Sequence, residues 1–351
     1  MLLGIPLHVA FAYTAIEYQW LVKDGQNSYL VDWGLYFLRL FRMPLFFVIS
    51  GFFSHYLIRR NPESFHLDRL KRLLIPLIVL FIVIVCPLRA LWLFGEMMSA
   101  PEIFDFRNFL HFLTQNFFAP TTSRYAIPAS WGHLWFLLYL YLFSVAGFWL
   151  RKIHLIKLNL ISLMGLTFLS FYLMTNSWVD LPLGILPKPS LLVYYGIFYY
   201  YGWQGLNQIE KVVKPFVSYF MLGTGVLLGS LRAFLEVDSE LGIGHFVFPN
   251  AALYVLSTLS TWLIIIGLIG AVKNLISREN LIISFFVKAS YSIYLIHLPI
   301  IVIFQLLLHK TNFHWSLKFV FISSMTVLIS SLIYKYLIQN KWPERFLKGQ
   351  Y

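Results

Sequence analysis

Residues 33–53 read Trp-Gly-Leu-Tyr-Phe-Leu-Arg-Leu-Phe-Arg-Met-Pro-Leu-Phe-Phe-Val-Ile-Ser-Gly-Phe-Phe, an apolar stretch that contains two arginines. A helix of about 20 residues crosses the hydrocarbon core of a bilayer, so this stretch is long enough to span it. One arginine at the centre of such a helix costs roughly 2.5–3.5 kcal/mol on insertion scales. Arg39 and Arg42 are three residues apart and share one helix face. The pair therefore predicts an anion site inside the membrane.

The composition is that of a membrane protein. Of the 351 residues, 59% are hydrophobic, 19% are aromatic and only 12% are charged, and the mean hydropathy is +0.72. Apolar stretches of about 20 residues recur along the chain, while the alternating pattern of an outer-membrane barrel is missing. The sequence thus predicts an all-α, polytopic membrane protein with about ten transmembrane helices in one bundle, forming a single domain over residues 1–351. The expected spans cover residues 2–20, 33–58, 73–94, 132–150, 158–175, 189–205, 215–234, 250–272, 284–306 and 316–338.

The formal net charge of +12 gathers in alternate loops. Basic residues follow every second span, in segments 59–72, 151–157, 211–214, 273–278 and 341–348. By the positive-inside rule this side is cytoplasmic, and an even number of spans places both termini there, in a bacterial inner membrane. The charge is thus a topology signal and predicts no nucleic-acid partner. The single cysteine, Cys86, offers neither a disulfide framework nor a thiolate metal site, and no metal is expected.

His8 lies in the first expected span, about 10 Å from its cytoplasmic end at 1.5 Å per residue. Arg42 lies about 14 Å from the outer end of the second span, so the two side chains can meet within a core of about 30 Å. Because an imidazole can act as a general base near neutral pH, His8, Arg42 and Arg39 are the candidate catalytic residues. A histidine that only bonds to a backbone carbonyl is the alternative. Asp32, two helical turns before Arg39, is expected to neutralise one arginine.

Arg69, Lys71 and Arg72 form a basic cluster at the cytoplasmic mouth after the second span. Arginine offers bidentate contacts to phosphate, so the cluster is a candidate phosphate dock. For an isolated loop, topology charge or contact with lipid headgroups is the simpler explanation.

Four further residues are candidate substrate-binding groups on the outer side. His133 begins the fourth span, and His297 lies in the outer half of the ninth. Tyr291 and Tyr294 precede His297 on the same span and could hydrogen-bond sugar hydroxyls. Packing or a membrane-interface belt is the alternative for each. The tyrosines within residues 194–201 suit a sugar-stacking wall or crowded helix packing equally well.

Four segments in the same order resemble the membrane-bound acyltransferase 3 family, closest to the branch that contains glucans biosynthesis protein C, which succinylates periplasmic glucans. They are Leu2-Leu-Gly-Ile-Pro-Leu-His8, Phe41-Arg-Met-Pro-Leu-Phe-Phe-Val-Ile-Ser-Gly-Phe-Phe-Ser54, His133-Leu-Trp-Phe-Leu-Leu138 and Ala289-Ser-Tyr-Ser-Ile-Tyr-Leu-Ile-His297. The resemblance covers nearly the whole chain. The ordered set is specific for the family and less so for the branch.

The resemblance implies an enzyme that moves an acyl group, not an amino-acyl group, from cytoplasmic acyl-CoA to a carbohydrate hydroxyl across the membrane. It makes His8 the catalytic histidine, Arg42 the buried arginine of the second-span motif, and Arg69 and Arg72 the Arg-x-x-Arg motif at the CoA end. One departure concerns a basic residue eleven positions before the histidine, which here would precede Met1. The chain is therefore expected to begin late relative to the family pattern.

The working hypothesis is a membrane O-acyltransferase with the lipid bilayer, acyl-CoA and a periplasmic or cell-surface glycan as partners. Acetyl-CoA or succinyl-CoA is the co-substrate, and no cofactor is bound permanently. His8 would deprotonate the acceptor hydroxyl or carry the acyl group. If the acyl group is succinyl, one arginine could instead hold its free carboxylate. A proton-coupled organic-anion or glycan transporter and a structural or polysaccharide-export scaffold are the alternatives.

Overall fold

The computed structural model describes residues 2–18, 20–99, 105–116, 131–151, 157–174, 178–179, 182, 184–205, 214–242, 249–275 and 280–350. Within these ranges every regular element is a helix, which confirms the predicted all-α class. The first half of the chain contains α1 (Gly4–Ala10), α2 (Tyr29–Arg60), α3 (Pro62–Arg69), η1 (Leu70–Leu74), α4 (Ile75–Leu80), η2 (Phe81–Val85), α5 (Cys86–Ser99), α6 (Phe106–Asn116), η3 (Gly132–Leu134) and α7 (Trp135–Leu150). The second half contains α8 (Leu160–Ser170), η4 (Phe171–Leu173), α9 (Pro189–Trp203), α11 (Pro215–Glu240), α12 (Asn250–Leu275), α13 (Leu281–Leu308), α14 (Trp315–Ile333), η5 (Tyr334–Ile338) and α15 (Trp342–Leu347).

Seven helical segments in the described ranges are long and apolar enough to cross a membrane. They match seven of the expected spans and show a polytopic membrane protein, but the expected number of about ten is not confirmed. The expected spans at 158–175 and 189–205 form the shorter helices α8–η4 and α9. The segment from Pro62 to Gly95 is continuous and includes two π-helical stretches, η1 and η2.

The expected first span over residues 2–20 is wrong. Helix α1 ends at Ala10, and the chain then folds back on itself before α2 begins at Tyr29. In this segment the buried Asp32 carboxylate accepts hydrogen bonds from the backbone N–H groups of Ala15 (2.7 Å) and Ile16 (3.3 Å). These bonds satisfy the backbone outside a helix, so the helical bonding pattern is not needed there.

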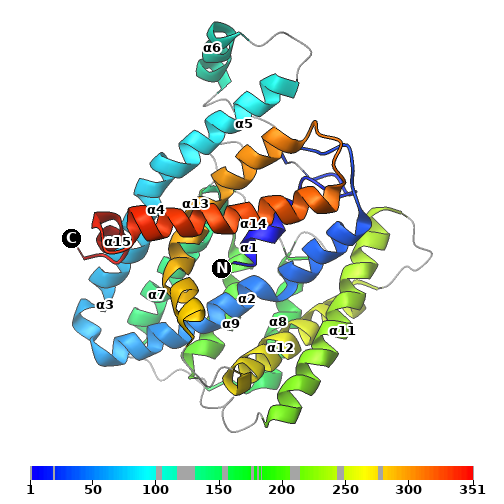
Figure 1. Cartoon of the computed structure of the whole chain (residues 1–351). Helices are drawn as coiled ribbons and strands as arrows, with labels where there is room; N and C mark the ends of the chain where they lie inside the picture. Colours follow the sequence, from blue (N-terminus) through cyan, green and yellow to red (C-terminus); the bar gives the residue numbers. More distant parts are fainter. Residues whose placement is uncertain are drawn as a thin grey trace.

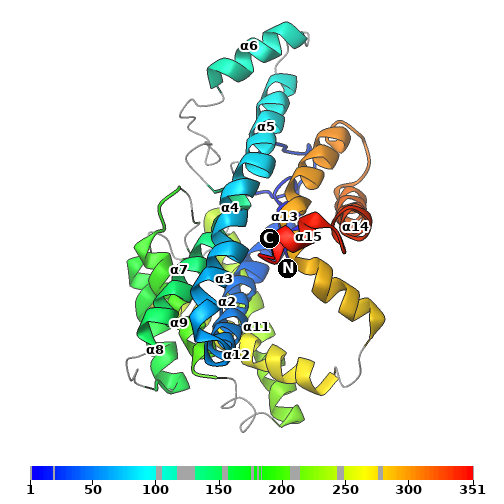
Figure 2. The ribbon, with the colours of Figure 1, turned by 90° about the vertical axis from the view of Figure 1, so that its left-hand side faces the viewer.

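Helix α1 lies within the bundle against α2, α13 and α14, as Figure 1 shows near its centre. Its residues Ile5, Leu7 and Val9 are buried. An isolated helix this short is unstable in water, so α1 depends on these neighbours for its structure. In both views α5 and α6 extend away from the rest of the bundle (Figure 2).

Two helix pairs approach each other through glycines. A Cβ added at Gly202 on α9 would overlap the carbonyl of Val48 on α2, and one at Gly51 would overlap the carbonyl of Tyr199. A Cβ at Gly225 on α11 would lie 2.8 Å from the backbone nitrogen of Ile264 on α12. Small residues of this kind let membrane helices pack backbone to backbone, where dispersion contacts are densest.

We expect Gly225→Ala to destabilise the protein, because α11 and α12 must separate to admit the methyl group. Overpacking of this kind costs about 1–3 kcal/mol, so the midpoint of thermal unfolding in detergent should fall. Gly223 is the matched control, because a Cβ there meets nothing within 4 Å on the same helix. Gly223→Ala should leave the midpoint unchanged or raise it. Equal midpoints for the two variants would contradict the tight contact.

Candidate functional site

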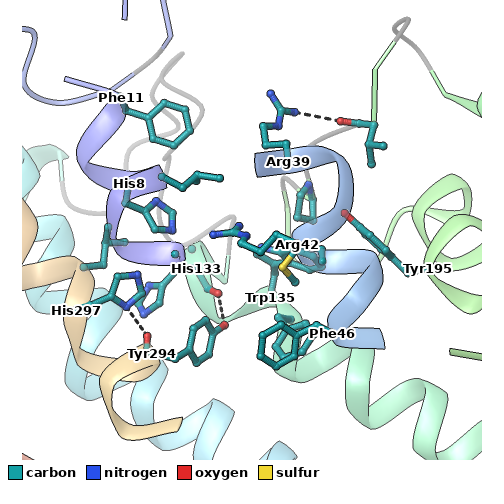
Figure 3. A pocket seen from close by; sticks show the side chains of 18 of the residues that line it. His8, Phe11, Arg39, Arg42, Phe46, His133, Trp135, Tyr195, Tyr294 and His297 are labelled. Carbon is teal, nitrogen blue, oxygen red and sulfur yellow. Dashed lines mark hydrogen bonds between the residues drawn. The ribbon is translucent and has the colours of Figure 1, made fainter. Parts of the chain in front are cut away.

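One cavity gathers most of the predicted site residues (Figure 3). Its volume is about 140 Å³, and it lies where α1, α2, η3, α7 and α13 meet. The predicted residues that line it are His8, Arg39, Arg42, His133, Tyr294 and His297. Gly4, Trp20, Met43, Phe46, Trp135 and Tyr195 are among the other lining residues.

Arg39 and Arg42 bring two positive charges to this cavity, and no Asp or Glu is among the described residues that line it. The Arg39 guanidinium donates to the carbonyl of Val179 at 3.1 Å, while Nε of Arg42 has no hydrogen-bond partner in the described part of the chain. The expectation that Asp32 neutralises one arginine is wrong, since its carboxylate is taken by the backbone of Ala15 and Ile16. Two guanidiniums without a carboxylate partner in the described part of the chain, inside an apolar bundle, favour a site for an anion or a developing negative charge.

A proline positions Arg42. Pro44 lies inside α2 and has no N–H to offer the carbonyl of Leu40. That carbonyl instead accepts from the hydroxyl of Thr261 on α12, at 3.3 Å. The stretch of α2 that carries Arg42 is thereby tied to α12.

His297 has a defined tautomer. Its Nδ1 lies 2.6 Å from the carbonyl oxygen of Tyr294. A carbonyl can only accept a hydrogen bond, so Nδ1 carries the proton and Nε2 of the neutral ring carries a lone pair. That Nε2 atom is buried and has no partner among the described residues.

His133 is fixed in a similar way by a second proline. Pro299 interrupts α13 and leaves the carbonyl of Leu295 without its helical donor. Nε2 of His133 lies 3.0 Å from that oxygen and therefore donates to it. The Tyr294 hydroxyl donates in turn to the carbonyl of His133. His133 thus has a structural contact in addition to its place at the cavity.

His8 faces His297 across the cavity, with 5.3 Å between the ring centroids. Its ring also stacks on Trp20 at 6.0 Å, and its buried Nδ1 has no partner in the described ranges. Gln305 on α13 hydrogen-bonds to two groups next to His8, the Trp20 side chain and the backbone of Val9. Its side-chain oxygen accepts from Trp20 Nε1 at 2.8 Å, and its amide nitrogen donates to the carbonyl of Val9 at 3.2 Å.

Gly4 leaves room for a reacting group. A Cβ at this residue would lie 3.3 Å from Nη1 of Arg42 and 3.8 Å from Nε2 of His297. The space beside Gly4 is therefore within reach of both a guanidinium donor and an imidazole lone pair. An active site needs such a position, where one atom can touch a base and an oxyanion donor.

The basic cluster lies elsewhere. Arg69 ends α3, and Lys71 and Arg72 lie on the π-helical turn η1; none of the three lines the cavity. Nε of Arg72 donates to the carbonyl of Lys348 at 2.8 Å. Tyr291 does not line the cavity either, and its hydroxyl donates to the carbonyl of Arg72 at 3.3 Å.

Among the described residues, no group of three or more His, Cys, Asp or Glu side chains could hold a metal ion. Sequence reasoning missed Gly4, Trp20 and Gln305. The prolines next to Arg42 and His297 were a visible signal that nearby carbonyls need donors from other helices.

A family model described as an acyltransferase domain matches residues 1–335. Together with the apolar helical bundle, this match defines a membrane-bound acyltransferase, which transfers groups other than amino-acyl groups. The chain belongs to the acyltransferase 3 family, which confirms the resemblance of its four segments.

Curated relatives agree with this family. The chain is 24% identical to glucans biosynthesis protein C of Salmonella paratyphi B over 345 residues, which cover 87% of this chain and 80% of that protein. It is 25% identical to the proteins of that name from Salmonella heidelberg and Salmonella typhi, with the same coverage. No solved structure gives a significant match.

We expect Gly4→Ala to lower the rate of acyl transfer about 10- to 100-fold, because its methyl group fills the space between Arg42 and His297 and displaces the reacting group. The measurement is the turnover number of the purified protein in lipid nanodiscs. Gly34→Ala is the control, since a Cβ there meets nothing within 4 Å. An unchanged rate for Gly4→Ala would show that the reaction takes place elsewhere.

Proposed function

We propose that this acyltransferase moves an acetyl or succinyl group from cytoplasmic acyl-CoA to a hydroxyl of a periplasmic or cell-surface glycan. The observation that carries the proposal is the convergence of His8, Arg42 and His297 on one cavity that also holds the Arg39 cation. The name of the curated relatives, glucans biosynthesis protein C, supports a glucan-like acceptor.

The chemistry centres on the thioester carbonyl. Attack on this carbon places negative charge on its oxygen, and the Arg42 guanidinium beside Gly4 is a donor for that oxyanion. His8 either deprotonates the acceptor hydroxyl that attacks this carbon or bonds to the carbon itself and carries the acyl group. Arg39 lines the cavity as a second cation and can hold the free carboxylate if the acyl group is succinyl.

The donor is expected to bind from the end of the bundle that carries Arg69, Lys71 and Arg72. Helix α13 runs from this end to the cavity, with Tyr291 bonded to the Arg72 backbone and His297 at the cavity. Six residues of helix separate them, an axial distance of about 9 Å. The phosphates of CoA would remain with the arginines while the acyl end reaches His8.

The positive-inside rule assigns the basic end to the cytoplasm of a bacterial inner membrane. Lys348 lies against Arg72, so the C-terminal segment belongs to the same end. In this orientation the acceptor enters from the opposite side, near Arg39 and Val179.

We expect the purified protein in nanodiscs to release CoA thiol from acetyl-CoA or succinyl-CoA and to esterify methyl β-glucoside, a probe acceptor. His8→Ala should abolish transfer, and Arg42→Gln should lower it about 100- to 1,000-fold, the usual effect of losing one oxyanion donor. Both variants should keep the thermal midpoint of the parent. Full activity of His8→Ala would refute its role. Movement of an organic anion across vesicles without consumption of acyl-CoA would instead indicate a transporter.

Substitution of Arg69 or Arg72 by glutamine should raise the KM for acyl-CoA about tenfold, because each loses a charge-assisted contact to phosphate. The parent protein should show the same trend when ionic strength is raised. Lys214→Gln changes an exposed cation on another loop of the predicted cytoplasmic face and is the control. An unchanged KM in both arginine variants would refute the phosphate dock.

A further inference from the structure

We propose that His297 is the proton acceptor for the incoming hydroxyl, which leaves His8 free to carry the acyl group as an N-acylimidazole. This inference rests on the proposed acyl transfer and divides its two steps between two histidines. His297, which the sequence predicts to bind substrate, is thereby given a catalytic role.

The first support is the orientation of the His297 ring. The Tyr294 carbonyl, 2.6 Å away, holds the proton on Nδ1 and so presents the Nε2 lone pair to the cavity. A carbonyl that orients an imidazole in this way has the role of the third member of a catalytic triad. The ring of His8 shows no such bond in the described ranges, and its Nδ1 is unpartnered.

The second support is distance. His8 lies 5.3 Å from His297 between ring centroids, and the space beside Gly4 is close to both Nε2 of His297 and Nη1 of Arg42. An acyl carbon bonded to His8 can therefore place its oxygen at Arg42. A hydroxyl approaching that carbon then meets the His297 lone pair.

Four charged or titratable groups face His297 among the residues that the structure describes. They are His8 from α1, Arg42 from α2, His133 from η3 and Tyr294 from its own helix. None of the described lining residues is a carboxylate. With its proton on Nδ1, the ring can accept a second proton at Nε2.

His133 is less suited to the same task. Its Nε2 donates to the Leu295 carbonyl, and its ring centroid lies 5.4 Å from that of His297. A Cβ at Gly4 would lie within 4 Å of Nε2 of His297 but of no His133 atom. Its contacts support α13, which carries His297.

Two balanced steps follow. In the first, a ring nitrogen of His8 forms a bond to the acyl carbon and the carbon–sulfur bond breaks. The proton on the other His8 nitrogen passes to the departing thiolate, which leaves N-acylimidazole and CoA thiol. In the second, the hydroxyl oxygen bonds to the acyl carbon while Nε2 of His297 takes its proton. The carbon–nitrogen bond breaks, and His297 returns the proton to His8.

The test separates the two steps. Parent protein, His297→Gln and His8→Ala in nanodiscs are mixed with radiolabelled acetyl-CoA or succinyl-CoA, first alone and then with methyl β-glucoside or hydroxylamine. Hydroxylamine attacks acyl groups without a general base. His309→Gln is the matched control, because His309 makes the same contact to a carbonyl three residues earlier on α13 and lies outside the cavity.

We expect His297→Gln to release about one equivalent of thiol and to retain the label on the protein. Its transfer to the glucoside should be slower by about 100-fold or more, while hydroxylamine removes the label at the parent rate. His8→Ala should neither release thiol nor become labelled, and His309→Gln should behave as the parent does. A retained thermal midpoint, checked also for His297→Asn, shows that the variants are folded.

Three results would overturn the inference while leaving acyl transfer in place. They are normal glucoside transfer by His297→Gln, loss of its first thiol release, and labelling of His8→Ala. A parent protein that releases no thiol from either acyl-CoA would instead refute the proposed function itself.

Discussion

Prolines inside the long helices determine how this bundle is joined at its centre. Each leaves the carbonyl four residues earlier without a helical N–H, and an unpaired carbonyl in an apolar environment is costly. The carbonyls of Leu40 and Leu295 are satisfied by Thr261 and His133, each from another helix. The same constraint therefore holds α2 to α12 and η3 to α13. These two contacts lie within one turn of Arg42 and His297.

The chemistry of the cavity follows from the cations and bases that line it. Guanidiniums and imidazoles meet there, and none of the described lining residues is acidic. In a low-dielectric interior such cations stabilise negative charge that appears during a reaction. The imidazole of His297, fixed by a backbone carbonyl, keeps one nitrogen available for proton transfer. An apolar bundle can therefore hold a polar reaction at its centre.

The helical class and the polarity of the cavity were predictable, because composition and the spacing of Arg39 and Arg42 are local properties of the sequence. The depths of His8 and Arg42 in the membrane, estimated from the sequence, predicted that their side chains can meet, and both line the cavity. The folding back of the chain after Ala10 was not predictable, since it involves Asp32 accepting from residues on another segment. The role of Gln305 is likewise hidden, because its partner Trp20 is 285 residues away. Sequence periodicity reports which residues face inward, and it does not report which of them meet.

The glycine crossing of α2 and α9 has a consequence for how such enzymes diversify. Gly51 and Gly202 bring the two backbones into direct contact, and α2 carries Arg42 while α9 carries Tyr195, both at the cavity wall. Main chains already touching cannot move closer, and separating them would forfeit their dispersion contacts. The width of this part of the chamber is thus set by the scaffold. Relatives that handle bulkier donors would be expected to trim the side chains that project into it and to keep the spacing of these two helices.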